Sequence, residues 1–234
     1  RGKGEGWLTA EYALLPTSTQ TRTMRDSAAC KKNGRSIEIS RLIGRAIRTT
    51  INFSVLGERT IYVDCDVLQA DGGTRIAALT GSSLALLEAQ KRWMAEGIIS
   101  APFLTDAVVG LSVGIYKGAI IVDPDYIEDA DINADFNVIM TASGNIIEMQ
   151  GGAEKESITW EQFTRIQTIA KTTIQTVIEA TDIKNRLESF SAFTKKPKII
   201  EKKDANQKSE QSYQKENRKP SIFSLELRSK EFQK

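Results

Sequence analysis

A strand, a turn with two adjacent glycines and a long helix follow one another without a break, and this succession restricts the fold more than any other feature. Apolar and polar residues alternate over residues 61–68, which predicts a strand with Cys65 facing the core. The strand leads into Gly-Gly-Thr-Arg at residues 72–75, and residues 76–94 read as a helix closed by Gly97. Such a unit requires a sheet with helices packed against it.

The remaining pattern predicts two more helices and two hairpins. Apolar residues recur at helical spacing over residues 35–53 and 159–181, with Ser157 or Thr159 as the cap of the second helix. Two hairpins turn at Lys117-Gly118 and Ser143-Gly144. The order of elements predicts an α+β domain, a mixed sheet with packed helices, over residues 1–193. Residues 194–234 form a basic tail that we expect to be disordered, acting either as an electrostatic aid to RNA binding or as a dispensable extension.

The chain contains no histidine, and this excludes several catalytic classes. Serine and cysteine hydrolases that use an imidazole base and histidine-ligated zinc enzymes are ruled out. The two cysteines, Cys30 and Cys65, cannot complete a zinc site by themselves. No apolar run approaches the roughly 20 residues of a membrane helix, and we expect a reduced, cytoplasmic protein that does not span a membrane. Chemistry must then come from carboxylates, arginines, hydroxyls, backbone amides and oxygen-ligated metal ions.

Charge is divided unevenly along the chain. The net charge is +6 over residues 1–60, −10 over residues 61–194 and +6 over residues 195–234. This asymmetry is typical of a polyanion held by one region while carboxylates work in another. An ordinary solvated surface would give the same counts.

Three segments carry candidate chemistry, and each has a simpler structural explanation. Gly-Gly-Thr-Arg at residues 72–75 brings backbone amides, a hydroxyl and a guanidinium to a helix start, which suits an anion, although a tight turn capped by Thr74 also fits. Six carboxylates within residues 123–135 suit Mg²⁺ or Mn²⁺, or form a solvated acidic loop; they lack the glycine and closing Glu of a calcium loop. A third segment is basic, with Arg22, Arg25 and Arg35 as well as Lys31 and Lys32 among small polar residues. It suits contacts with a sugar-phosphate backbone or is a solvated loop.

Several longer motifs occur together with these segments. They are Gly6–Tyr12 (GWLTAEY), Glu38–Arg45 (EISRLIGR), Leu56–Thr60 (LGERT), Asp64–Arg75 (DCDVLQADGGTR) and Glu148–Gly151 (EMQG). Together they resemble the bacterial ribonuclease PH family, and the resemblance spans residues 1 to about 190.

The resemblance implies a fold like domain 2 of ribosomal protein S5. It implies a phosphorolytic 3′→5′ exoribonuclease, also described as a tRNA nucleotidyltransferase, which uses inorganic phosphate as co-substrate and releases nucleoside diphosphates. The implied substrates are the 3′ ends of tRNA precursors and other RNAs. The implied assembly is a homo-hexameric ring, a trimer of dimers.

The resemblance also assigns roles to individual residues. Phosphate binding falls to Arg35, Gly73, Thr74 and Arg75. Catalysis, with a divalent metal such as Mg²⁺ or Mn²⁺, falls to Asp129 and Asp135. Binding of tRNA falls to Arg22 and Arg25.

Two departures from the family pattern keep other functions open. The family usually has a segment with strands before the Gly-Trp motif, and we expect sheet edges to be uncovered where it is missing. Thr17 stands where the family often has another RNA-contacting arginine. A non-catalytic RNA-binding or ring-forming subunit of an exosome-like assembly is therefore an alternative hypothesis, and a hydrolytic nuclease that uses the acidic segment is a third.

Overall fold

A computed structural model describes residues 4–25 and 33–190 of the chain. Cys30, Lys31, Lys32 and the predicted tail lie outside the described residues, as does the predicted domain boundary at residue 193. The elements are β1 (Trp7–Leu14), α1 (Gly34–Arg48), α2 (Phe53–Leu56), β2 (Thr60–Val67), α3 (Thr74–Ala95), β3 (Val108–Tyr116), β4 (Ala119–Val122), α4 (Tyr126–Ala130), β5 (Ala134–Thr141), β6 (Ile146–Ala153), α5 (Trp160–Ala180) and α6 (Ile183–Glu188). The α+β class predicted from the sequence is confirmed.

The strands belong to two sheets. β1 and β2 form a parallel pair, in register from Trp7 opposite Thr60 to Leu14 opposite Val67. The other four strands form an antiparallel sheet in the order β4-β3-β5-β6, and both predicted hairpins belong to it. β1 is the one strand in the described part of the chain that the sequence analysis did not predict. Its inward-facing residues are Leu8, Ala10 and Tyr12. Because these residues differ in size and polarity, the alternation of apolar and polar residues along β1 is weak.

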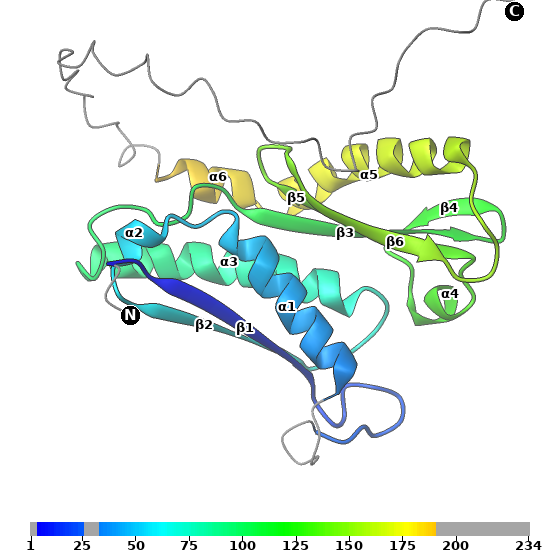
Figure 1. The fold of residues 1–234 in the computed structure, drawn as a ribbon, viewed down its shortest axis with the longest axis horizontal. Coiled ribbons are helices and arrows are strands. Elements are labelled where there is room, and N and C mark those ends of the chain that lie inside the picture. Colours follow the sequence, from blue (N-terminus) through cyan, green and yellow to red (C-terminus); the bar gives the residue numbers. More distant parts are fainter. Residues whose placement is uncertain (1–3, 26–32, 191–234) are drawn as a thin grey trace, which may run out of the picture. The chain divides into compact units, whose positions relative to one another are not determined.

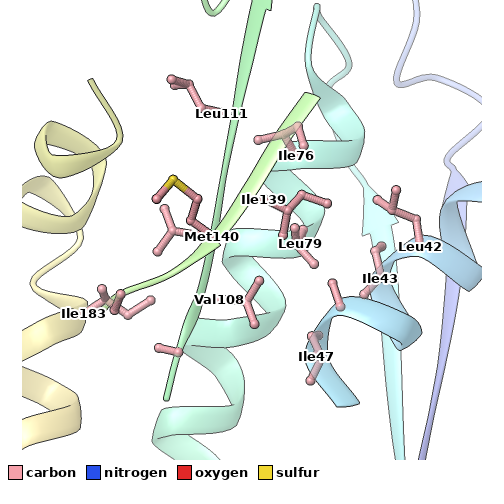
Figure 2. Packing of buried hydrophobic residues seen from close by; sticks show 14 of the residues in the cluster. Leu42, Ile43, Ile47, Ile76, Leu79, Val108, Leu111, Ile139, Met140 and Ile183 are labelled. Carbon is pink, nitrogen blue, oxygen red and sulfur yellow. The ribbon is translucent and has the colours of Figure 1, made fainter. Parts of the chain in front are cut away.

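Helix α3 lies between the two sheets, and α5 covers the opposite face of the four-stranded sheet (Figure 1). Neighbouring residues of β5 therefore serve different layers, because side chains alternate across a strand. Ile139 points toward Leu79 of α3, whereas Met140 points away from it, on the side of Ile183 (Figure 2). Both β5 residues are buried in the shared core.

The first helix ends earlier than the sequence predicted. α1 stops at Arg48, five residues short of the predicted end, and the predicted range is therefore wrong at its C-terminus. The hydroxyl groups of Thr49 and Thr50 donate to the carbonyls of Ala46 and Ile47, which satisfies carbonyls at the helix end. Apolar residues continue beyond this point because Ile51 is buried and forms an isolated β-bridge with Leu104, and α2 begins at Phe53.

The acidic segment is not wholly a loop. Residues 126–130 form α4, whose start is closed by a reciprocal capping box between Asp125 and Glu128. The Asp125 side chain accepts from the backbone N–H of Glu128, and the Glu128 side chain accepts from that of Asp125. The same device opens α5, where Thr159 and Gln162 pair in this way, so Thr159 is the cap.

Candidate active site

The predicted site residues converge on one cleft with a volume of about 400 Å³. Its walls come from the N-terminus of α1, the N-terminus of α3, the end of α4 and the adjoining faces of β3 and β5. Its lining residues are Arg35, Gly73, Thr74, Arg75, Ser112, Asp129, Ala130, Ile132, Asp135, Asn137, Glu154 and Lys155. All six residues predicted for phosphate binding and catalysis are among them.

The double glycine shapes the wall at the start of α3. Gly73 is the helix N-cap in a left-handed conformation (φ 68°), and no side chain caps the helix. A Cβ atom at Gly72 would lie 2.0 Å from the carbonyl oxygen of Pro124, so only glycine fits there. Asp71 accepts hydrogen bonds from the backbone N–H of Gly72 (2.9 Å) and of Tyr126 (2.7 Å), joining this turn to α4. The first N–H groups of α3 thus remain available to an anion.

Three side chains give this wall its charge and orientation. The hydroxyl of Thr74 lies 2.8 Å from that of Tyr12 in β1. The Arg75 guanidinium donates to Glu38 of α1 at 3.2 Å, which holds the arginine at the cleft. Arg35 stands in the first turn of α1, behind the N-cap Asn33, and its side chain also lines the cleft. The wall is cationic and rich in donors, which suits a phosphate group.

The opposite side of the cleft carries carboxylates. Asp135 lies near the start of β5, opposite Gly114 of β3, and is partly buried. Burial raises the pKa of its carboxyl group, and the negative charges of Glu154 and Asp129 raise this pKa further. The positive charge of Arg75 acts in the other direction and lowers it. The cleft thus places a partly desolvated carboxylate within electrostatic reach of an arginine.

Most of the predicted acidic cluster does not face the cleft. Asp125 and Glu128 are used in the cap of α4, and Asp131 forms an ion pair with Lys155. Asp129 and Asp135 are the members that line the cleft. Across the described residues, no group of three or more Asp, Glu or Cys side chains is arranged as a metal cage. Two carboxylates nevertheless fit Mg²⁺, which usually takes one or two of them and completes its shell with substrate phosphates and water.

Arg22 and Arg25 are not among the residues that line the cleft. Both are exposed in the segment after β1, and Arg25 borders a different pocket, together with Arg41 and Asp64. The structure therefore does not bring these two predicted RNA-binding residues to the predicted phosphate site.

The sequence analysis missed six lining residues; the four polar ones are Ser112, Asn137, Glu154 and Lys155. One signal could have found Asn137. It stands two residues after Asp135, and alternate residues of a strand share a face. Ser112 could not have been found without the register that places it opposite Asn137.

Comparison with known proteins agrees with this architecture. Residues 1–92 match the 3′ exoribonuclease family, domain 1, and residues 106–173 match domain 2 of the same family. A ribonuclease PH from Syntrophomonas wolfei is 49% identical over 178 residues, which are 76% of this chain and 74% of that protein. The chain belongs to the 3′ exoribonuclease family. The predicted resemblance to ribonuclease PH is confirmed.

The family's two domains both contribute to the cleft. Arg35 and the Gly-Gly-Thr-Arg turn lie in the residues matched to domain 1, whereas Asp129 and Asp135 lie in those matched to domain 2. The cationic wall and the carboxylate wall are therefore brought together only when the exoribonuclease domains pack on one another. Within the described part of the chain, no helix is long and apolar enough to cross a membrane.

Proposed function

We propose that this member of the exoribonuclease family shortens RNA from its 3′ end by phosphorolysis, with the cleft as its active site. One observation carries the proposal: Arg35, Arg75 and the uncapped start of α3 face Asp129 and Asp135 across one cavity. A phosphate ion fits the cationic wall. The last phosphodiester of an RNA then lies between this ion and the carboxylates.

Phosphorolysis does not require a histidine. An oxygen of inorganic phosphate attacks the phosphorus of the terminal phosphodiester, and the bond from that phosphorus to the 3′ oxygen of the preceding nucleotide breaks. The products are a nucleoside diphosphate and an RNA one nucleotide shorter, whose 3′ oxygen takes up a proton. Phosphate is already an anion at neutral pH, so the site must mainly position two anions and neutralise charge. Arg35 and Arg75 supply that positive charge, and Thr74 donates a hydroxyl hydrogen bond.

The carboxylates have a supporting role. Asp129 and Asp135 would hold a divalent cation, Mg²⁺ or Mn²⁺, together with phosphate oxygens of the substrate. The cation, when bound, offsets negative charge on the departing 3′ oxygen. Arg75 lies within electrostatic reach of Asp135, and its charge favours the ionised carboxylate that such a ligand requires.

The finer assignments are those that the resemblance to the ribonuclease PH family implies. The substrates are 3′-extended tRNA precursors and other RNA 3′ ends, gripped outside the cleft by Arg22 and Arg25. The chain works in the cytoplasm as a ring of six copies, a trimer of dimers. Arg22 and Arg25 are exposed and do not line the cleft, which supports a role in holding the body of the RNA.

The test is product identification. The purified chain is mixed with a 3′-extended tRNA precursor and Mg²⁺, with and without phosphate. Release of nucleoside diphosphates only with phosphate is expected. Nucleoside monophosphates would instead identify a hydrolase, and RNA retention without turnover would favour the non-catalytic alternative.

A pair of variants ties the activity to the cleft. Arg75→Ala is expected to abolish phosphate-dependent release. Arg92→Ala removes an exposed arginine of α3 that pairs with Glu96 and is expected to retain full activity. Full activity in Arg75→Ala would contradict the assignment.

A further inference from the structure

Two of the residues that line the cleft are polar and buried, and neither has a role in the assignments above. Ser112 of β3 and Asn137 of β5 stand directly opposite each other in the antiparallel ladder. Their exposed fractions are 7% and 4%. Burying polar groups in a sheet is unfavourable unless they gain hydrogen bonds, so a buried Ser-Asn pair needs an explanation.

The hydrogen bond between them orients the amide. The Ser112 hydroxyl donates to Oδ1 of Asn137 at 3.4 Å. This contact turns Oδ1 toward Ser112 and leaves Nδ2 of Asn137 on the other side of the amide. Among the described residues, nothing accepts a hydrogen bond from this Nδ2, and it is not one of the polar atoms sealed in the interior without a partner. The donor therefore borders the cleft that Asn137 lines.

The position of Asn137 relates it to both walls. It shares a strand face with Asp135, two residues earlier, and with Ile139, two residues later, which packs toward α3 (Figure 2). Asn137 thus lies between the carboxylate and the part of the sheet that α3 covers. A neutral donor there adds a hydrogen bond for an anion. A lysine at the same position would instead form an ion pair with Asp135, which the neutral amide does not.

We propose that Asn137 is an additional phosphate-binding residue, with Ser112 as the residue that holds its amide in the donating orientation. Nδ2 of Asn137 donates to an oxygen of the inorganic phosphate bound between Arg35, Arg75 and the start of α3. The proposal deepens the proposed function and rests on it for the identity of the anion. It predicts that Asn137 affects affinity for phosphate and leaves affinity for RNA unchanged.

The experiment compares Asn137→Ala and Asn137→Asp with the wild-type chain. Alanine removes the donor, and aspartate keeps the shape but presents a repelling carboxylate. The KM for phosphate is expected to rise about 10- to 100-fold, the range that a hydrogen bond to a charged group contributes. The KM for RNA is expected to change less than about twofold. Asn52→Asp is the matched control, because Asn52 caps α2 away from the cleft and an aspartate can accept the same bonds.

Direct phosphate binding separates this proposal from the proposed function. Calorimetric titration of the free proteins with inorganic phosphate needs no turnover, so it can be read even if the wild-type chain releases no diphosphates. Weaker phosphate binding by the Asn137 variants, with wild-type circular dichroism, supports the assignment. Ser112→Ala tests the proposal if either Asn137 variant fails to fold. This variant is expected to lose less phosphate affinity than the Asn137 variants do. Phosphate affinity within about twofold of wild type in the folded variants, or an equal rise of both KM values, would overturn the proposal.

Discussion

The backbone carbonyl oxygen of Pro124 occupies the space where a side chain at Gly72 would begin. A Cβ atom there would lie 2.0 Å from that oxygen, well inside contact distance. Gly72 lies in the turn between β2 and α3 in the residues of domain 1, and Pro124 precedes α4 in those of domain 2. Because Gly72 has no side chain, the turn before α3 can pack directly against the segment before α4, and this contact joins the two walls of the cleft.

Substituting this glycine should therefore damage the site and the fold together. Gly72→Ala forces the turn away from Pro124 and is expected to lower the free energy of unfolding by about 1–3 kcal/mol. Phosphate-dependent activity should fall with it. The control is Gly81→Ala within α3, where a Cβ meets nothing within 4 Å. That change should raise the free energy of unfolding by about 0.5–1 kcal/mol. Chemical denaturation measures both, and equal stability of the two variants would contradict the packing argument.

We expect the ionised Asp135 to lower the free energy of unfolding at neutral pH, compared with an asparagine at the same position. Burial and the charge of Glu154 raise the pKa of this carboxyl group in the folded state above its ordinary value of 3.8. The folded state therefore binds the proton more tightly than the unfolded chain does, and ionisation disfavours folding. Asp135→Asn is expected to unfold at higher temperature than wild type above the raised pKa, while losing activity. The gain should shrink as the pH falls through that pKa and vanish below 3.8. A thermal stability difference independent of pH would contradict this electrostatic cause.

The contact between Tyr12 and Thr74 predicts an effect that reaches the cleft from β1. Tyr12→Phe removes only the hydroxyl that lies 2.8 Å from Thr74. We expect a loss of about 1 kcal/mol in the free energy of unfolding and weaker phosphate binding, because Thr74 loses a partner that holds its hydroxyl. Tyr62→Phe is the matched control, since Tyr62 is 71% exposed on the outer face of β2. Unchanged phosphate binding in Tyr12→Phe would show that Thr74 keeps its orientation without Tyr12.

Arg22 and Arg25 should govern RNA affinity but not phosphate affinity. Replacing each with alanine is expected to raise the KM for tRNA precursors and leave the KM for phosphate unchanged, because both residues lie outside the cleft. Each lost phosphate contact should also reduce the slope of log affinity against log salt by about 0.7–0.9. Filter binding over a range of salt concentrations measures this slope. An unchanged slope in the double variant would remove these arginines from the RNA interface.

The sequence determined those features that depend on neighbouring residues. The alternating run over residues 61–68, the double glycine and the helix behind it predicted β2, the turn and α3, because local geometry alone forces that succession. The helix cap was predicted as Ser157 or Thr159 for the same reason, and the structure shows that it is Thr159. The end of α1 was missed because Thr49 and Thr50 satisfy carbonyls through their own hydroxyls, a choice that apolar spacing does not reveal.

Only the tertiary structure decided which of these residues act together. Spacing and composition do not distinguish the six carboxylates within residues 123–135, and the family resemblance alone singled out Asp129 and Asp135. The structure supplies the physical reason: α4 uses Asp125 for its cap, Lys155 pairs with Asp131, and Asp129 and Asp135 line the cleft. Asn137 meets its partner in β3 through strand register, which relates residues 25 positions apart. Contacts over such separations depend on how the sheets and helices pack, and that packing places an anion-binding helix start and two carboxylates around one cavity.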